Sequence, residues 1–188
     1  MNTQTYAEII NSKFNRNRFS SLVSSIGDHL NTRKDRFQKS EIIELSFQIY
    51  SDNFFVHIDK MGRDHRDNQN MIDLEFKFIS DGLFTKVKKE PKKFVTVKVK
   101  NSLGRDKGTT IDNPADFYIL AQQDAMAIIN FEDLEQYLIS VPDGIEAKIP
   151  FDALTIVYKP EDVTTSINES VNYKKDKEDA QLKLINSF

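Results

Sequence analysis

Two runs of alternating residues constrain the fold of this 188-residue chain most strongly. The first, residues 71–80 (MIDLEFKFIS), places Asp73 on its polar face, and the second, residues 94–102 (FVTVKVKNS), places Lys98 and Lys100 on its polar face. Successive side chains of a strand point to opposite faces of a sheet, so each run predicts a strand with one apolar and one polar face. We expect these strands to form neighbouring strands of a hairpin, which would bring a carboxylate and a lysine together.

The other segments predict an α+β (α/β-like) fold with a mixed central β-sheet flanked by helices. Apolar residues at helical spacing predict helices over residues 6–13, 19–32 and 40–50, with a short helix over 132–139. Strands are expected over residues 53–59, 116–122, 125–131 and 153–158, the run at 116–122 being a buried central strand. Residues 60–70 are polar and predict a turn.

The domain organisation follows from length and composition. Residues 1–160 are long enough for one domain with a real core, which we expect over about 39–139, and residues 161–188 predict a polar tail or short helix.

The helix over 40–50 is expected to bury one face and expose the other. The expected buried residues are Ile42, Leu45 and Ile49, and the expected polar face carries Glu41, Glu44 and Gln48.

Composition excludes several classes of function. The chain has no cysteine, which excludes disulfides, thiolate zinc sites and cysteine nucleophiles. It has no apolar run of about 20 residues, so we expect no membrane contact and a cytoplasmic location. Its net charge of −3 argues against purely electrostatic binding of nucleic acid. Neither a GxSxG elbow nor a phosphate-binding glycine loop is present.

The order of the segments resembles the PD-(D/E)xK nuclease superfamily, which includes many type II restriction endonucleases. In that family a helix with a glutamate precedes a strand with an aspartate, and the next strand carries Glu, Asp or Gln, one further residue, and Lys. The helix KSEIIEL with Glu44, the strand MIDL with Asp73 and the strand VKVKNS with Lys100 follow this order within residues 39–134. The resemblance implies a restriction-endonuclease-like core and a Mg²⁺-dependent endonuclease that hydrolyses DNA phosphodiester bonds.

The resemblance also implies which residues would form the site. Mg²⁺ prefers hard oxygen ligands, for which Asp73, Glu75 and Glu44 are the candidates. Lys100 would orient or help to deprotonate the attacking water and would stabilise charge on the phosphorus. Lys98 would contact phosphate.

One position departs from the family pattern. The residue two before Lys100 is Lys98, where the family has an acidic residue or glutamine, and a protonated lysine does not bind a divalent cation. Glu75 from the neighbouring strand would then supply the missing carboxylate. Alternatively the site is Asp59 with the triplet Glu75-x-Lys77, or the fold is kept without catalysis.

A second constellation lies in the polar stretch between the expected strands. His57, Asp59, Asp64 and His65 could form a transition-metal site or a histidine-based nuclease centre. No cysteine and no established ligand spacing accompany these residues, so this interpretation ranks below the carboxylate–lysine site.

Two basic stretches, residues 13–39 and 86–107, predict contacts to the DNA backbone, because lysine and arginine neutralise phosphates. The residues expected to contact DNA are Lys92, Lys93, Lys98, Asn101, Ser102, Arg105 and Lys107. The expected partner is double-stranded DNA, bound by a homodimer that places two sites across the duplex. The alternative is a catalytically inactive nuclease-like module that binds DNA or protein.

Overall fold

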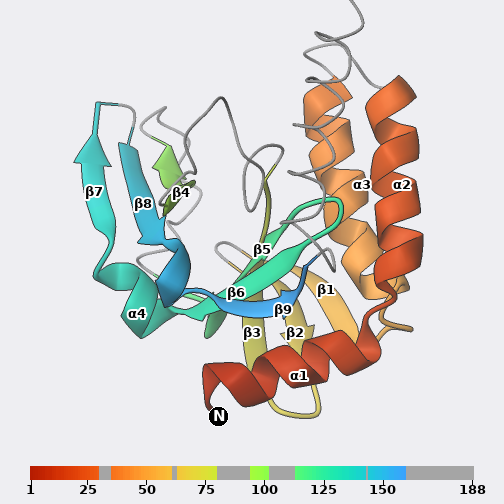
Figure 1. Ribbon diagram of the computed structural model, residues 1–188, viewed down its shortest axis with the longest axis horizontal. Helices are drawn as coiled ribbons and strands as arrows, with labels where there is room; N and C mark the ends of the chain where they lie inside the picture. Colours follow the sequence, from red (N-terminus) through yellow and green to blue (C-terminus); the bar gives the residue numbers. More distant parts are fainter. Residues whose placement is uncertain (30–34, 61–62, 80–93, 102–112, 143, 160–188) are drawn as a thin grey trace, which may run out of the picture.

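The structure is a computed structural model, and it describes residues 1–29, 35–60, 63–79, 94–101, 113–142 and 144–159. The side chains of residues 27–29, 35–40, 59–60 and 100–101 lie outside the description, although their backbone is included. The helices and two β-sheets form a mixed α+β arrangement, as the sequence predicts (Figure 1).

The helices are α1 (Thr3–Lys13), α2 (Arg16–His29), α3 (Asp35–Ile49) and the short α4 (Phe131–Glu135), with a 3₁₀ turn at Phe151–Ala153. The predicted helices at residues 6–13, 19–32 and 40–50 are therefore confirmed over their described parts. The N-terminus of α1 is capped by the Asn2 side chain, which accepts a hydrogen bond from the Thr5 amide at 2.7 Å. None of the helices in the described part of the chain is long and apolar enough to cross a membrane.

Six strands form the main sheet in the order β1-β2-β3-β5-β6-β9. They are β1 (Phe55–Lys60), β2 (Arg63–Asp67), β3 (Ile72–Phe78), β5 (Phe117–Ala121), β6 (Met126–Asn130) and β9 (Thr155–Tyr158). β3 and β5 run parallel, and every other neighbouring pair is antiparallel, which makes the sheet mixed. The three strands β4 (Phe94–Asn101), β8 (Gly144–Pro150) and β7 (Leu138–Val141) form a second sheet.

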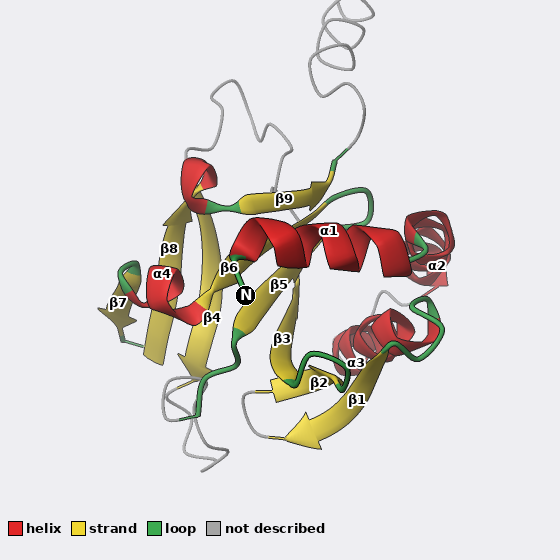
Figure 2. Ribbon diagram, turned by 90° about the horizontal axis from the view of Figure 1, so that it is seen from below, coloured by secondary structure: helices red, strands yellow, loops and turns green. Residues whose placement is uncertain are grey.

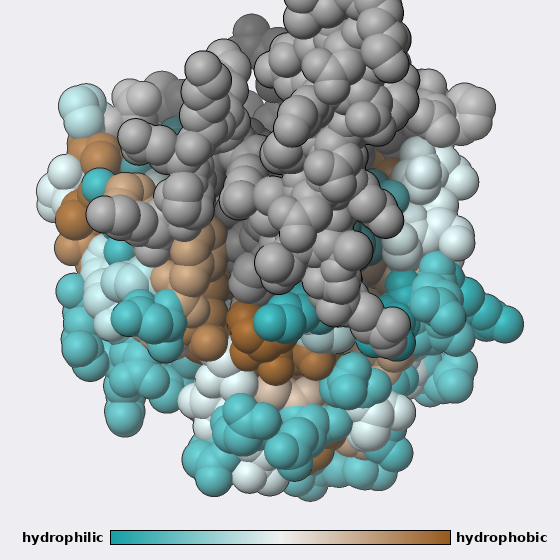
Figure 3. Space-filling view, viewed as in Figure 1, coloured by the Kyte–Doolittle hydropathy of each residue, from teal (hydrophilic) through white to brown (hydrophobic). Residues whose placement is uncertain are grey.

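β5 separates two hydrophobic cores. Its residues Phe117, Ile119 and Ala121 belong to the core beneath α1, α2 and α3, and Tyr118 and Leu120 belong to the core shared with the three-stranded sheet. All five residues are buried, which confirms the predicted central strand. Figure 2 shows α1 crossing one side of the main sheet, where it packs against β6 and β9. In Figure 3, hydrophobic side chains gather in the middle of the visible face, between α2 and the three-stranded sheet.

Two expectations about the strands are wrong. Residues 60–70 were expected to form a turn, but Arg63–Asp67 forms β2, which pairs with β1 on one side and β3 on the other. Residues 94–102 were expected to pair with residues 71–80, but β4 pairs with β8, so that Lys98 lies opposite Glu146 and Lys100 opposite Ile145. Alternation identifies a strand but carries no information about its neighbour.

The predicted orientation of α3 is also wrong. Ile42, Leu45 and Ile49 are 42%, 44% and 63% exposed, whereas Ile43 and Phe47 are fully buried. Phe47 stacks on the ring of Phe55 with 4.7 Å between the ring centroids. The large aromatic side chain therefore sets which face of the helix is buried, because burying a phenyl ring removes more apolar surface from water than burying one aliphatic side chain.

Candidate carboxylate–lysine site

Four neighbouring elements bring five ionisable side chains together. The group consists of Glu44 of α3, His57 of β1, Asp64 of β2, and Glu75 and Lys77 of β3. We call these five residues the carboxylate–lysine cluster. Its position follows from the antiparallel register of β2 and β3, in which His65 lies opposite Leu74, because that register brings Asp64 beside Glu75.

An ion pair, a histidine–carboxylate contact and a backbone hydrogen bond hold the cluster. Lys77 Nζ donates to Glu75 Oε1, and His57 Nε2 lies 3.1 Å from Glu44 Oε1. Asp64 Oδ2 accepts a hydrogen bond of 2.8 Å from the amide of Phe76. This bond ties the Asp64 side chain to the strand that carries Glu75 and Lys77, so the three groups keep a fixed relative position.

Glu75 is the most buried member, with 3% of its surface exposed. Its second oxygen, Oε2, is buried and has no hydrogen-bond donor among the described residues. The carboxyl of Asp64 lies close enough to interact with Glu75 through their side chains. A buried carboxylate oxygen without a donor is costly, so this oxygen is available for a proton or for a bound cation.

The electrostatics of the cluster favour protonation of its carboxyl groups. Burial raises the pKa of Asp64 to about 6, with a further rise from Glu44 and an opposing effect from Lys77. Burial also raises the pKa of Glu75, and the Asp64 carboxylate adds to that rise. Burial lowers the pKa of Lys77, but attraction to Glu75, Asp64 and Glu44 outweighs it and raises the pKa overall. When these carboxyls are ionised, a bound divalent cation would relieve the repulsion and the burial cost that raise their pKa values.

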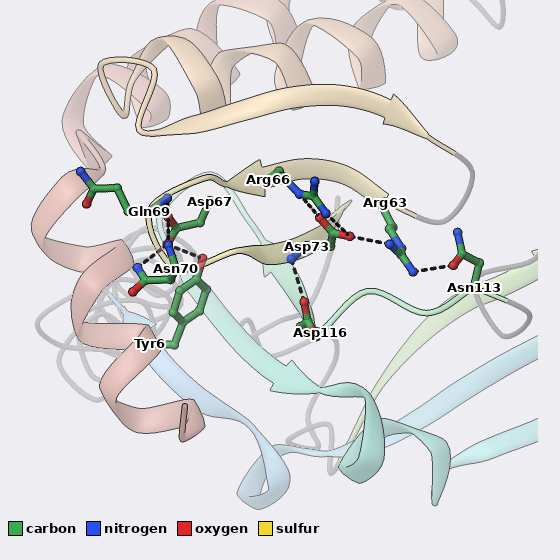
Figure 4. A network of polar contacts seen from close by, with 9 residues as sticks. All are labelled: Tyr6, Arg63, Arg66, Asp67, Gln69, Asn70, Asp73, Asn113 and Asp116. Carbon is green, nitrogen blue, oxygen red and sulfur yellow. Dashed lines mark hydrogen bonds and ion pairs between the residues drawn. The ribbon is translucent and has the colours of Figure 1, made fainter.

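Asp73 lies in a separate network (Figure 4). Its Oδ1 accepts from Arg66 Nε at 2.6 Å, and its Oδ2 accepts from Arg63 Nη1 at 2.5 Å and from Arg66 Nη2 at 3.2 Å. The Asp73 amide donates to Asp116 Oδ2 at 2.8 Å, and Arg63 also donates to Asn113. Both oxygens of Asp73, which the sequence predicted as a metal ligand, are therefore occupied by guanidinium groups in this arrangement.

The turn between β2 and β3 is fixed by the fully buried Asp67, which Figure 4 shows beside α1. Its oxygens accept from the amides of Gln69 and Asn70 at 2.9 and 3.1 Å, and from the Asn70 side chain at 2.7 Å. The Tyr6 hydroxyl of α1 donates to Asp67 Oδ2 at 3.2 Å. These bonds set the register of the hairpin and hence the alignment of Asp64 with Glu75.

The sequence-predicted residues divide into three groups. Glu44, Glu75 and Lys77 lie in the cluster. Lys98 is exposed on β4 in the second sheet, and Lys100 belongs to the same strand, so neither shares a sheet with Glu75. The side chains of Asp59, Lys100 and Asn101 lie outside the described residues, as do Lys92, Lys93, Ser102, Arg105 and Lys107 altogether.

Asp64, Arg63 and Arg66 were not among the residues expected in the carboxylate–lysine site. Asp64 appeared only in the histidine constellation with His57, Asp59 and His65. Of these, His65 is fully buried and burial lowers its pKa to about 3, which makes it a neutral core residue. The signal that could have identified Asp64 is the Asp-x₁₀-Glu-x-Lys spacing that ends in Glu75 and Lys77.

The donor set of the cluster fits Mg²⁺. Among the residues whose side chains are described, no three His, Cys, Asp or Glu side chains are grouped closely enough to hold a metal ion by themselves. Mg²⁺ usually keeps several waters and takes only one or two protein carboxylates together with substrate phosphates. Asp64 and Glu75, with the donor-free Oε2, supply that number of hard oxygen ligands.

Comparison with protein-family models, with curated proteins and with solved structures gave no match for this chain.

Proposed function

We propose that the chain is a Mg²⁺-dependent endonuclease that hydrolyses phosphodiester bonds of double-stranded DNA, acting as a cytoplasmic homodimer in the manner of a type II restriction enzyme. The observation that carries this proposal is the buried pair Asp64–Glu75 beside the charged Lys77. The pair spans two adjacent antiparallel strands, of which the second runs parallel to β5.

The order of these residues supports the resemblance better than the order expected from the sequence. With β2 recognised as a strand, α3 carries Glu44, β2 carries Asp64, and β3 carries Glu75-Phe76-Lys77. The departure at Lys98 then no longer concerns the site, because β4 belongs to the other sheet. Lys77 accordingly replaces Lys100 as the proposed catalytic lysine.

Each residue has a chemical role in this proposal. Asp64 and Glu75 would hold Mg²⁺, which when bound acidifies a coordinated water and withdraws charge from a phosphoryl oxygen. Lys77 keeps its proton on Nζ, because its pKa is raised, and would donate hydrogen bonds to the phosphate or to the attacking water. His57 orients the Glu44 carboxylate, which adds a third negative group facing the same site.

The DNA-binding part of the proposal has support from sequence. Most of the basic stretch at residues 86–107 falls in residues 80–93 and 102–112, which lie outside the described residues. Arg63 and Arg66 flank Asp64 in the sequence, and about 26% and 30% of their side-chain surfaces are exposed. They add positive charge next to the proposed site, although Asp73 neutralises part of it.

The proposal is tested by incubating the protein with unmodified phage DNA in Mg²⁺ and in EDTA, followed by gel electrophoresis. We expect discrete Mg²⁺-dependent fragments from the wild type and none from Asp64→Asn. Asp152→Asn, an exposed aspartate on the 3₁₀ turn, is the matched control and should cleave as the wild type does. A smear would support a nuclease without sequence specificity, and intact DNA under all conditions would favour the inactive binding module.

A further inference from the structure

A hollow of about 270 Å³ lies at the edge of the main sheet, away from the carboxylate–lysine cluster. Its walls come from the first turn of α2, the turn between β5 and β6, and the end of β9. The residues that line it are Arg16, Asn17, Ser20, Gln123, Asp124, Tyr158 and Lys159. The pairing of Met126 with Tyr158 places the β5–β6 turn next to the end of β9.

The charge of the hollow is positive. Arg16 and Lys159 contribute two cationic side chains, and Asp124 contributes one carboxylate. The N-terminus of α2 adds roughly half a positive charge from its aligned peptide dipoles. With one carboxylate against two cations and the helix end, the hollow is suited to an anion.

The first turn of α2 carries positive charge where helices usually carry negative charge, and a bound anion would reduce the resulting repulsion. Helices prefer acidic side chains in their first turn, but α2 has none there and begins with Arg16 instead. Asn15 caps the helix by accepting from the Arg18 amide at 3.2 Å, so the cap satisfies one amide without adding negative charge. Among the residues that line the hollow, the single carboxylate of Asp124 compensates only part of the repulsion between Arg16 and the helix dipole.

Tyr158 supplies an independent observation at the same place. The residue is 7% exposed, and its hydroxyl is buried without a hydrogen-bond partner among the described residues. Its ring stacks against Phe14 with 6.3 Å between centroids, which fixes the direction of the hydroxyl. Tyr158 is one of the residues that line the hollow, and the charges of two other lining residues, Asp124 and Arg16, act on its hydroxyl. Burial raises the pKa of Tyr158, which keeps the hydroxyl protonated as a donor.

We propose that this hollow binds a phosphate group, held by Arg16, Lys159 and the Tyr158 hydroxyl at the N-terminus of α2. A phosphate offers several acceptor oxygens, which match two cations, a hydroxyl donor and the helix end. A carboxylate ligand would offer fewer acceptors for the same donors. The phosphate comes either from a free phosphate or phosphate monoester, or from the backbone of a nucleic acid. The proposal shares no residue with the carboxylate–lysine cluster and does not rest on the proposed nuclease function.

The test is a calorimetric titration of the full chain with inorganic phosphate and, separately, with a short DNA duplex, both at constant ionic strength and without Mg²⁺. We expect the wild type to bind phosphate. The affinity should fall about tenfold or more in Arg16→Gln and in Tyr158→Phe, because hydrogen bonds to a charged group are stronger than those between neutral groups. Arg18→Gln is the matched control, because Arg18 lies in the same helical turn but lines a different hollow with Ser21 and Tyr50. Its affinity should stay within about twofold, because exposed charges are screened by solvent and salt.

The two titrations distinguish the sources of the phosphate. Inorganic phosphate that binds and competes with the duplex indicates a backbone phosphate, and phosphate that binds without such competition indicates a free phosphate or monoester. The thermal unfolding temperature of Tyr158→Phe without ligand should equal or exceed that of the wild type, because the variant loses an unpartnered buried hydroxyl. Absence of phosphate binding by the wild type, or equal binding by Arg16→Gln, Tyr158→Phe and Arg18→Gln, would overturn the proposal.

Discussion

Asp64 and Asp73 stand on neighbouring strands, and their surroundings give the two carboxylates different roles. Asp64 faces Glu75 and Glu44, and burial raises its pKa to about 6. Asp73 instead receives three hydrogen bonds from Arg63 and Arg66. The same residue type therefore costs stability as an anion at one position and holds two arginines at the other, which gives opposite predictions for the two asparagine variants.

Asp64→Asn should stabilise the protein at pH 8. The pKa of Asp64 is raised from 3.8 to about 6, so this carboxyl binds its proton more tightly in the folded state. Its contribution to stability is therefore complete below pH 4, falls between pH 4 and 6, and is absent above pH 6. Removing the charge should raise the free energy of unfolding at pH 8 by about 1–3 kcal/mol. Urea denaturation at pH 8 and pH 4 measures this, with Asp152→Asn as the control. A less stable Asp64→Asn at pH 8 would contradict this reading of the site.

Asp73→Asn should destabilise the protein. The change leaves Arg63, whose side chain is only 26% exposed, without its charged partner. We expect a loss of about 1–3 kcal/mol from this contact, less than for a fully buried pair because water still reaches the guanidinium group. The same urea experiment at pH 8 gives the value. An unchanged midpoint would mean that the network in Figure 4 contributes little to stability.

At the scale of elements, hydrophobic periodicity was sufficient to predict the type and position of six elements, because each has a regular apolar pattern. These elements are α1, α2, β3, β5, β6 and β9. It failed for β2, whose sequence RDHRD has no apolar residue. This strand forms because β1 and β3 pair with it on both sides, while ion pairs and hydrogen bonds hold Arg63, Arg66 and Asp67. Such tertiary compensation leaves no local pattern in the sequence.

The orientation of α3 predicts unequal effects of two alanine substitutions. Phe47→Ala should lower the free energy of unfolding by about 3–5 kcal/mol, because the ring is fully buried against Phe55 and Phe76. Leu45→Ala should cost less than about 1 kcal/mol, because the side chain is 44% exposed. Chemical denaturation of both variants tests the helix orientation. Equal losses of stability, or a larger loss for Leu45→Ala, would contradict this orientation of the helix.

At the scale of the whole molecule, the candidate site exists only because distant segments meet. α3, β1 and the β2–β3 hairpin lie along one end of the main sheet, and Asp67 and Tyr6 fix the hairpin (Figures 1 and 4). Glu44, Glu75 and Lys77 were all candidates from the sequence, with Lys100 preferred to Lys77 as the catalytic lysine. That preference depended on pairing residues 94–102 with residues 71–80, whereas β4 belongs to the other sheet.

Metal binding should depend on pH in a direction set by the cluster. Because Asp64 is protonated below pH 6, a cation must displace a proton there, and Mg²⁺ should raise the unfolding temperature more at pH 8 than at pH 5. The Mg²⁺ effect should disappear in Asp64→Asn. Differential scanning calorimetry with and without Mg²⁺ at the two pH values measures it. A Mg²⁺ effect that is independent of pH, or that persists in the variant, would place the ion elsewhere.

The most direct measurement of the central claim compares the rates at which Lys77→Ala and Lys100→Ala cleave the same DNA in Mg²⁺, with folding of both variants checked by circular dichroism. The account predicts a loss of about 10²-fold or more for Lys77→Ala, because a positioned acid–base or donor group contributes at least that factor. Lys100→Ala should remain within a few-fold of the wild type, since its strand belongs to the other sheet. Full activity of Lys77→Ala, or a selective loss in Lys100→Ala, would contradict a site built on β2 and β3.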